Sequence, residues 1–534
     1  MAKPIESITI VGGGTSGWIA ACYLARIFGE KVRTQQLKIT VIESPDVGII
    51  GVGESTARPM SDLLRILGVP ESEFIKRCNA TFKLGGLFTN WDFDTNGKPI
   101  TWVNPFFSQT DINGFNPAAA FASFAMDQNG EPTGEDFTEA ISVCPEMIRG
   151  RRGPRAIGAQ DYQSDIPYSY HMDAVELAAI LMEQGKRLGV RQILDHVNDV
   201  KLDERGYVSD LTLKENGDYP VEFIIDATGF ASIIIGKALG EPFEPYKKYL
   251  LNDRAAVAQL PHEDPTKIEP TSRATGMNAG WSFRVPLFNR VGSGYIYSSD
   301  FISDDEAIAE FKALAGDAAK GAEPRVIRMR IGKTRRSWVK NCVALGLSSG
   351  FVEPLEATAI YSVHVALQWL VSYFPDSDFD PAVAARYNKM IDGLYNEIID
   401  FIALLFCTGN REDTPYWQAV HNDMEIPPRL KENLELWRST FPDDLDLGTR
   451  TFFTPTSYRS ALMGKRFFKG GDNMQAAALG ETNWKKYLEL RKQRTQGLLQ
   501  KLPDHYELLK NIRGEGDKSP IAFQSFSLTH GGFN

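Results

Sequence analysis

The chain has 534 residues, of which 43% are hydrophobic, and a formal net charge of −10 with a pI near 5.4. This length is enough to bury a large core and to form about three domains of ordinary size. The acidic balance argues against nucleic acid or an anionic membrane as a partner, because both favour surfaces rich in Lys and Arg.

The N-terminus leads directly into a short apolar strand and lacks the basic and apolar regions of a signal peptide. No apolar run reaches the length that a membrane-spanning helix needs. The cysteines are widely scattered, without a CxxC pair, and the seven histidines are scattered too. We therefore expect reduced thiols, a cytoplasmic location and no metal site.

The first elements predict a dinucleotide-binding fold. Residues 7–11 read as a buried strand, 12–17 as a glycine-rich turn, and 18–28 as a helix. A second strand over 37–42 ends at Glu43, whose carboxylate we expect to accept hydrogen bonds from an adenosine ribose. Glu43 follows Gly12 at more than the usual spacing of about 20 residues, so 29–36 is interpreted as an insertion.

A GxGxxG pattern alone is weak evidence, since glycine-rich turns also occur for purely steric reasons. Here the strand before it, the helix after it and the acidic strand end favour a pyrophosphate bound by free N–H groups at the helix N-terminus.

Later segments predict more of the same module. A helix opens at 171–173 and runs to about Leu188, strands follow near 196–202 and 208–213, and 221–230 reads VEFIIDATGF with Gly229 in its closing turn. Residues 343–346 form another buried strand that ends at Gly346. The predicted fold class is therefore α/β (α+β overall), with a doubly wound FAD-binding module assembled from about 1–90, 166–240 and 331–375.

The segments between these parts differ in composition. Residues 91–165 and 241–330 are richer in aromatics, Pro and Gly, which predicts a β layer on the substrate side. From 376 to 534 we expect a mostly helical, substrate-binding subdomain. Asp380 is the predicted N-cap and Pro381 the first residue of a helix that runs to about Phe406, whereas 514–534 is expected to be a loosely held tail.

Six motifs occur in an order that resembles the flavin-dependent tryptophan halogenase family, with the clearest match over residues 1–375. One motif could arise by chance, but the ordered set is specific. The motifs are Gly12-x-Gly14-x-x-Gly17, GVGEST at 51–56, TFKLG at 81–85, GWSFRVP at 280–286, WVKN at 338–341 and PLEAT at 354–358.

The resemblance implies a fold similar to single-component flavin monooxygenases and a two-component reaction. A separate flavin reductase supplies reduced FAD, which with O2 and halide yields hypohalous acid; this crosses the protein to a small aromatic substrate. The residues 51–56 resemble the family's flexible strap beside the flavin, although a plain loop explains them as well. The expected cofactor-binding residues are Gly12, Gly14, Thr15, Ser16, Gly17, Glu43, Gly51, Val52, Gly53, Glu54, Ser55, Thr56, Gly229 and Gly346.

Lys83 and Glu356 match the family's catalytic lysine and glutamate. Hypohalous acid diffuses freely, so selective reaction requires one positioned donor beside the aromatic ring. The cationic ring intermediate then needs a nearby carboxylate that stabilises and deprotonates it. Taken singly, Lys83 suits a strand lysine reaching solvent, and Glu356 a carboxylate at a helix N-terminus. Burial should lower the Lys83 pKa and a paired glutamate should raise it, with the net sign open.

The resemblance places the halide on the N–H groups of Thr358 and Ala359, which open an apolar helix. Family members often have glycine in place of Ala359, which leaves chloride against bromide open, and we favour the more easily oxidised bromide. Trp281, Phe283 and Pro286 occupy the family's WxWxIP pattern, a wall between flavin and substrate, although an aromatic core stripe explains them nearly as well.

Family enzymes that act on free tryptophan grip its amino and carboxylate groups with elements of the C-terminal region, and no segment of this sequence matches those elements. We therefore expect an indole-brominating branch of the family, with free indole or another electron-rich aromatic favoured over tryptophan. A flavin-dependent aromatic hydroxylase is the first alternative and a non-catalytic flavin-binding protein the second. The natural substrate, the ring position, the reductase and the oligomeric state stay open.

Overall fold

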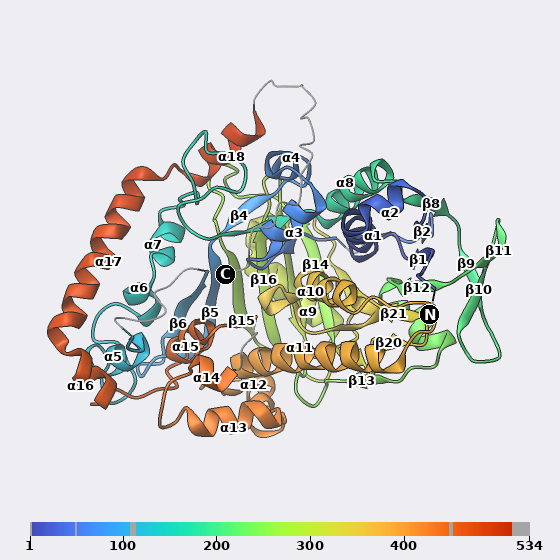
Figure 1. The fold of residues 1–534 in the computed structure, drawn as a ribbon. Helices are drawn as coiled ribbons and strands as arrows, with labels where there is room; N and C mark the ends of the chain where they lie inside the picture. The colour runs from blue at the N-terminus through green and yellow to red at the C-terminus, as the bar shows by residue number, and fades with distance from the viewer. Residues whose placement is uncertain (1–2, 49–50, 107–113, 448–451, 515–534) are drawn as a thin grey trace.

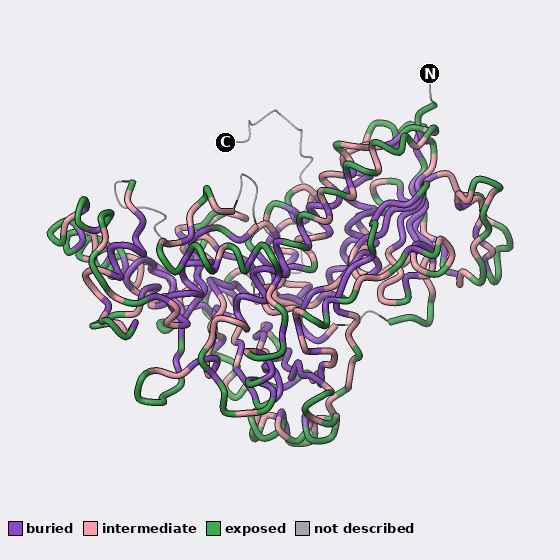
Figure 2. The backbone as a smooth tube through the Cα atoms, turned by 90° about the horizontal axis from the view of Figure 1, so that it is seen from below, coloured by how far each residue is buried: buried purple, intermediate pink, exposed green. Residues whose placement is uncertain are grey.

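The computed structural model describes residues 3–48, 51–106, 114–447 and 452–514 (Figure 1). Its centre is formed by two large sheets that share no strand. Figure 2 shows buried backbone running through these sheets, and exposed backbone on the outer helices and on the small β9–β11 sheet at the right edge.

The first sheet has six strands in the order β20-β21-β12-β1-β2-β8. All neighbouring strands are parallel except β20 and β21. The buried, β-branched runs of β1 and β12 suit strands that are covered on both faces. The strands are β1 (Ser7–Val11), β2 (Lys38–Glu43), β8 (Arg191–Leu194), β12 (Phe223–Asp226), β20 (Trp338–Val339) and β21 (Cys342–Ala344).

Alternate side chains of this sheet enter different cores. Ile8 and Ile10 pack in the main core with helices α1 (Thr15–Ile27), α8 (Ala174–Arg187) and α10 (Thr358–Ser372). Val11 packs on the other face, in a smaller core that contains the three-stranded sheet β9 (Val197–Leu202), β10 (Val208–Leu213) and β11 (Gly217–Pro220). The predicted α/β fold class is thus confirmed.

The second sheet has seven strands in the order β18-β14-β17-β16-β15-β5-β6, and two distant stretches of the chain contribute to it. Strand β15 pairs in parallel with β5, which joins the two stretches. The strands are β5 (Gly85–Phe93), β6 (Pro99–Pro105), β14 (Arg254–Leu260), β15 (Ser272–Met277), β16 (Gly280–Pro286), β17 (Val291–Tyr297) and β18 (Arg325–Arg328).

Three short strands form a further small sheet in the order β3-β7-β4. The strands are β3 (Glu54–Ser55), β4 (Thr81–Lys83) and β7 (Ser169–Met172). His171 and Met172 therefore end a strand, which corrects the prediction that a helix opens at residue 171. Asp173 is the N-cap of α8, because its carboxylate accepts from the backbone N–H groups of residues 175 and 176.

Shorter elements connect these sheets. The helices are α2 (Gly29–Arg33), α3 (Met60–Leu67), α4 (Glu71–Arg77), α5 (Pro117–Phe124), α6 (Phe137–Ile141), α7 (Cys144–Arg149) and α9 (Asp304–Ala315). A third small sheet contains β13 (Phe243–Pro245), β19 (Gly332–Thr334) and β22 (Gly350–Phe351). Single turns are η1 (Gly229–Ala231), η2 (Ile233–Ala238), η3 (Gly316–Ala319), η4 (Gly346–Ser348) and η5 (Pro354–Glu356).

The elements described after α10 are all helices. The longest, α11 (Pro381–Cys407), begins as predicted, with the Asp380 carboxylate accepting from the N–H of Ala382 at 2.8 Å. The rest are α12 (Pro415–Asn422), α13 (Pro428–Leu436), α14 (Asp444–Leu447), α15 (Pro455–Gly464), α16 (Met474–Leu479), α17 (Glu481–Lys501) and α18 (His505–Arg513). The predicted tail lies outside the described residues, except for its first residue.

The last helix returns to the N-terminal part of the chain, where α18 packs against α4 (Figure 1). Within the described ranges, no helix combines the length and the apolar character needed to cross a bilayer.

Candidate active site

The glycine turn after β1 is shaped for close backbone approach. Gly12 has φ of +113°, and a Cβ there would lie 2.2 Å from the carbonyl oxygen of Ala227. A Cβ on Gly17 would lie 1.9 Å from the carbonyl oxygen of Gly12. Beside Gly14, in contrast, a Cβ would meet open space, and the N-terminus of α1 has no side-chain cap. The first N–H groups of α1, at Thr15 and Ser16, are therefore available to a phosphate.

The remaining residues predicted for the nucleotide surround this turn. Glu43 accepts from the Trp18 indole at 3.2 Å and from the Gln192 amide, and its carboxylate lies where a Cβ of Gly13 would be. Gly346 has φ of +62°, and a Cβ there would lie 2.3 Å from the Ser16 hydroxyl. Gly229 also has positive φ, with open space beside it.

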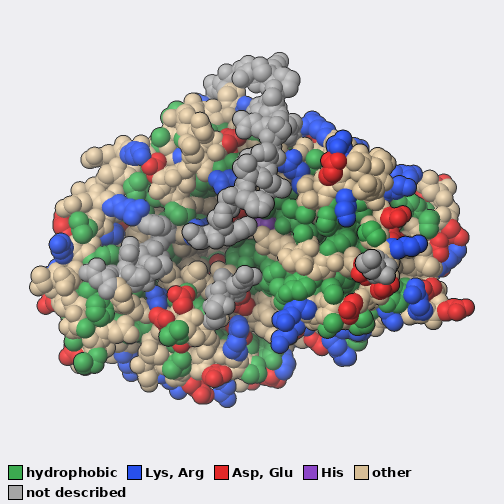
Figure 3. Space-filling model, in the orientation of Figure 1, with side chains coloured by type: hydrophobic (Ala, Val, Ile, Leu, Met, Phe, Trp, Pro, Cys, Tyr) green, Lys and Arg blue, Asp and Glu red, His purple; other side chains and the backbone are tan. Residues whose placement is uncertain are grey.

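These residues lie at the carboxyl ends of neighbouring parallel strands, where dinucleotides bind in such sheets. An open turn with uncapped N–H groups and a nearby carboxylate fits the FAD that the resemblance implies. On the face shown in Figure 3, hydrophobic side chains gather over the region of α1, α3 and α10.

The predicted strap, 51–56, runs from the start of α8 to the strand that carries Lys83. Near its beginning, a Cβ on Gly51 would lie 2.9 Å from the Val175 side chain, and Val52 is buried. A Cβ on Gly53 would lie 2.8 Å from Leu287, so this part of the strap packs closely on the β16–β17 turn.

The second half of the strap is tied to β7. Glu54 and Ser55 pair with it as β3, and the Thr56 hydroxyl contacts the Ser169 hydroxyl at 2.7 Å. Burial, with a smaller contribution from Asp173, raises the pKa of Glu54 to about 7.

Lys83 is the last residue of β4 and is 3% exposed. Its Nζ donates to the carbonyl oxygen of Thr56 at 3.4 Å and lies 5.1 Å from the centre of the Phe106 ring. Burial lowers its pKa to about 8, and Glu356 opposes this shift. The net direction that the sequence left open is therefore downward, because loss of solvation outweighs the carboxylate.

Glu356 ends η5, is separated from α10 by Ala357, and is partly buried. Its Oε1 accepts from the Asn104 amide at 3.0 Å. Burial raises its pKa, while Lys83 and Asn104 act in the opposite direction. Lys83 and Glu356 therefore influence each other, although no ion pair within 4.0 Å joins these two described residues.

Asn104 and Phe106 were missed by the sequence reasoning. They lie two residues apart, Asn104 within β6 and Phe106 directly after its end, and each contacts one member of the predicted catalytic pair. Two-residue spacing places side chains on one face of a strand. The only local signal is a polar residue in an otherwise apolar strand end, TWVNPF, and it does not reveal the partner.

His505 on α18 was also missed. Its Nε2 accepts from the backbone N–H of Phe82 at 3.1 Å, and its Nδ1 lies 3.0 Å from the carbonyl oxygen of Ile268. This pattern requires a neutral imidazole, and burial lowers the His505 pKa to about 4. The last helix thus binds the strand residue next to Lys83.

The predicted halide residues open α10. Ala357 has φ of +57°, and no side chain caps the helix. Thr358 is buried and Ala359 is exposed. A helix start without a side-chain cap suits an anion.

The three residues predicted to form the wall each contact a different partner. Trp281 is buried, and its indole N–H donates to Glu353 Oε2 at 2.9 Å, as does the Asn252 amide. Phe283 is half-buried, with its ring 6.3 Å from that of Trp281. Pro286 contributes its carbonyl oxygen, which accepts from the Thr81 hydroxyl at 2.6 Å.

Of the three wall residues, only Pro286 therefore forms a hydrogen bond with β4, the strand that contains Lys83. Glu353 was not predicted; it is fully buried, with a pKa raised by burial to about 7. Among the described residues, no cluster of His, Cys, Asp or Glu has a metal-binding arrangement.

Comparison with known proteins relates this arrangement to a family. The tryptophan halogenase family model matches residues 7–479. The chain is 34% identical to 7-chloro-L-tryptophan 6-halogenase KtzR from Kutzneria sp. (strain 744), over 95% of this chain and 99% of that protein. It is 31% identical to tryptophan 7-halogenase RebH from Lentzea aerocolonigenes, over 96% and 100% of the two chains.

Among solved structures, Tar14, a tryptophan C-6 flavin-dependent halogenase (chlorinase) from taromycin biosynthesis, superimposes with a TM-score of 0.87 at 33% identity. The match covers 95% of this chain and 100% of Tar14. The family model, the full-length relatives and the shared fold agree: the chain belongs to the flavin-dependent tryptophan halogenase family.

Proposed function

We propose that the protein halogenates an electron-rich aromatic, indole or a tryptophan-like compound, and that bromide is its preferred halide and chloride a possible one. FAD reduced by a separate flavin reductase is the cofactor. The observation that carries this proposal is the convergence of Lys83 and Glu356, 273 positions apart in the sequence, at one buried place where each shifts the pKa of the other.

The residues divide the work as follows. When bound at the glycine turn, reduced FAD supplies the electrons that activate O2 for oxidation of halide. Thr358 and Ala359 hold the halide with their N–H groups. Lys83, with a pKa of about 8, is mostly protonated at pH 7 and donates a hydrogen bond to hypohalous acid.

Glu356 has a raised pKa, which makes its carboxylate a better acceptor for the proton that the ring loses. Lys83 and Glu356 form no ion pair within 4.0 Å, so neither charged group is committed to a direct contact with the other.

The substrate class rests on the relatives and on the elements that bind free tryptophan in the family. KtzR and RebH are named for halogenation of tryptophan compounds. No segment of the sequence matches the elements with which family enzymes grip the amino and carboxylate groups of free tryptophan, and we therefore infer free indole as the first candidate. The expected partners are the flavin reductase and a small aromatic substrate. We expect no nucleic acid or membrane partner, and we expect the protein in the cytoplasm.

Product analysis tests the proposal. The protein is incubated with reductase, NADH, FAD, indole and either bromide or chloride, and the products are identified by mass. Bromoindole supports the proposal, and hydroxyindole supports the aromatic hydroxylase. A non-catalytic flavin protein gives neither product and no hypobromite that a reagent can trap. Tryptophan in place of indole tests the substrate preference in the same assay.

Replacement of Lys83 tests its role. We expect Lys83→Ala to reduce bromoindole formation by about 100-fold or more, because positioned hydrogen-bond donors contribute factors of that size. Flavin oxidation should continue, since the glycine turn is unchanged, and hypobromite should become trappable in solution. Lys98→Ala, an exposed lysine in the β5–β6 hairpin, is the control. Bromoindole formation at the normal rate in Lys83→Ala would refute the assignment.

A further inference from the structure

A narrow cavity lies where the end of the strap, α3 and the first turns of α10 meet. Its volume is about 10 Å³, close to the least that holds one water molecule. Its walls include Thr56, Met60, Leu63, Ile360, Tyr361 and His364.

The cavity is lined by residues next to the proposed halide site and next to Lys83. Ile360 directly follows the two residues expected to hold the halide. Thr56 also lines the cavity, and its carbonyl oxygen accepts the hydrogen bond from Lys83. The cavity therefore borders both the start of α10, where oxidation of the halide is proposed, and the residue that binds Lys83.

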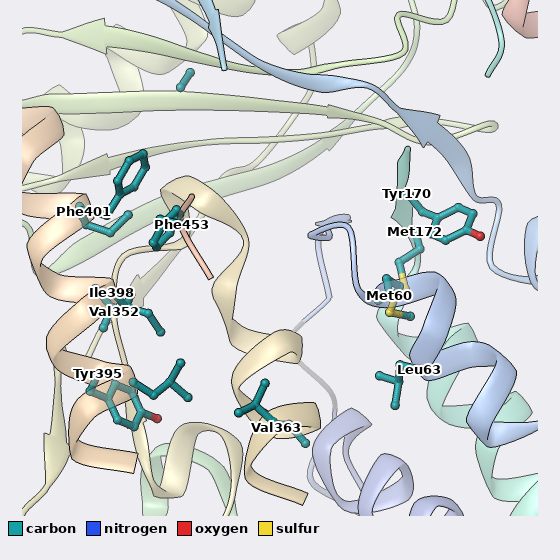
Figure 4. Packing of buried hydrophobic residues seen from close by; sticks show 14 of the residues in the cluster. Met60, Leu63, Tyr170, Met172, Val352, Val363, Tyr395, Ile398, Phe401 and Phe453 are labelled. Atoms are coloured by element: carbon teal, nitrogen blue, oxygen red, sulfur yellow. The ribbon is translucent and has the colours of Figure 1, made fainter. Parts of the chain in front are cut away.

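Met60 is the easily oxidised member of this wall. Among the described residues that line the cavity, it alone carries a thioether. Met60 is 3% exposed, so oxidants in bulk solvent reach it poorly. Figure 4 shows Met60 and Leu63 on α3 on the side of Met172 and Tyr170 from β7, an element that contacts α3.

We propose that Met60 is the internal site that hypohalous acid oxidises when no aromatic substrate accepts the halogen. This inference rests on the proposed function, which supplies the oxidant. A sulfur–oxygen bond forms and the oxygen–halogen bond breaks. The thioether loses two electrons and becomes a sulfoxide, the halogen is reduced to halide, and the proton of the acid is released.

The reaction has a structural consequence. A sulfoxide is polar and bulkier than a thioether, and a packed core does not accommodate it without disturbance. Met60 lies beside both the strap and α10, so its oxidation disturbs the elements that carry Thr56 and the halide residues. Turnover without aromatic substrate should therefore inactivate the enzyme from within.

Peptide mass spectrometry tests this proposal on the whole enzyme. The protein turns over with reductase, NADH, FAD and bromide but without indole, in the presence of catalase and excess free methionine that scavenge oxidants in solution. The reference residue is Met474, which is 84% exposed. We expect several-fold more sulfoxide at Met60 than at Met474. Hypobromite added to resting enzyme without scavengers should give the opposite order.

Two further arms identify the oxidant. Omission of bromide should abolish Met60 oxidation, because peroxide alone is removed by catalase. Addition of indole should protect Met60, because the aromatic ring consumes the halogen. Equal or greater oxidation at Met474 during turnover, or Met60 oxidation without bromide, would overturn the proposal.

The test separates this proposal from the proposed function. If bromoindole forms in the indole arm while Met60 stays unmodified in its absence, the halogenase assignment stands and Met60 is not the oxidised site. If neither bromoindole nor trapped hypobromite forms, both proposals fail.

A variant tests the link to inactivation. Met60→Leu is a volume-conserving exchange that removes the thioether. We expect this variant to complete several-fold more turnovers before it loses activity, after melting temperatures have established that it is folded. Met474→Leu is the matched control and should inactivate like the wild type. Equal lifetimes for Met60→Leu and wild type would show that Met60 oxidation does not limit the enzyme.

Discussion

At the residue scale, the Lys83 ammonium lowers the stability of the fold. Burial depresses its pKa from 10.5 to about 8, so between these pH values the unfolded chain binds more protons than the folded one. Stability contributed by this group therefore rises with pH across that window and is lowest below pH 8. A residue retained at such a cost is expected to serve function rather than folding.

We expect Lys83→Met to be more stable than the wild type at pH 7, by about 1–3 kcal/mol, because the buried charge is removed. The difference should shrink toward pH 10, where the wild-type lysine is neutral in the folded state. Thermal unfolding at both pH values measures this, with Lys98→Met as the exposed control. A variant no more stable than wild type at pH 7 would contradict the account of the Lys83 pKa.

Asn104 gives a second prediction for a single residue. Its amide donates to Glu356 and is one of two groups that keep the carboxyl pKa from rising further. We expect Asn104→Ala to raise the Glu356 pKa, so that the acidic limb of the kcat/KM profile moves to higher pH. Activity should be lost most at low pH and recover as pH rises.

Thr101→Ala is the matched control, since Thr101 is exposed on the same strand β6. A loss of activity by the same factor at every pH would instead assign Asn104 a purely structural role.

At the element scale, Glu353 joins β16 to the turn that carries Glu356. Its Oε2 accepts from both Trp281 and Asn252 in a fully buried place. We expect Glu353→Leu to leave both donors unpaired, at a cost of about 1–3 kcal/mol each. Glu353→Gln keeps a carbonyl acceptor and should lose less stability.

A double-mutant cycle with Trp281→Phe measures this connection by thermal unfolding. When Trp281→Phe is already present, Glu353→Leu leaves only the Asn252 donor of this pair unpaired. It should therefore lower the stability by less than it does in the wild type. Additive effects of the two substitutions would mean that the Trp281–Glu353 hydrogen bond contributes nothing to the position of β16.

Local patterns were sufficient for the elements of the nucleotide turn. The strand run 7–11, the glycines after it and the cap Asp380 depend on neighbouring residues, and the structure has these elements. The helix start at residue 171 was wrong because the polar Asp173 marks a cap, whereas the two residues before it pair with β3 and β4. An amphipathic pattern alone does not separate a strand end from the helix that follows it.

The contacts around Lys83 and Glu356, unlike these local patterns, join residues that are far apart in the sequence. Asn104 meets a carboxylate 252 positions away, and His505 meets a backbone N–H 423 positions away. No local periodicity encodes such pairs, since they depend on how the two large sheets and the last helix pack together. Family motifs gave Lys83 and Glu356, but the residues that hold them required the structure.

At the scale of the whole molecule, the predicted site is assembled from parts that are far apart in the chain. The glycine turn follows a strand of the six-stranded sheet, Asn104 and Trp281 lie on the seven-stranded sheet, and Lys83 lies on the small sheet of β3, β7 and β4. The last described helix closes this arrangement, because His505 on α18 binds the strand of Lys83. A change near the C-terminus should therefore affect chemistry at residue 83.

We expect His505→Leu to leave the Phe82 N–H unpaired, to lower the melting temperature and to slow halogenation more than it weakens flavin binding. The folded His505 has a pKa of about 4 against 6.5 in the unfolded chain, so its stabilising contribution is complete above pH 6.5 and is lost as pH falls toward 4. The stability difference between wild type and variant should shrink over that range.

Glu507→Ala, an exposed change on the same helix, should leave the melting temperature and the rate of halogenation unaltered. A pH-independent difference would mean that the imidazole is not held neutral, and normal halogenation in a folded His505→Leu would separate α18 from the position of Lys83.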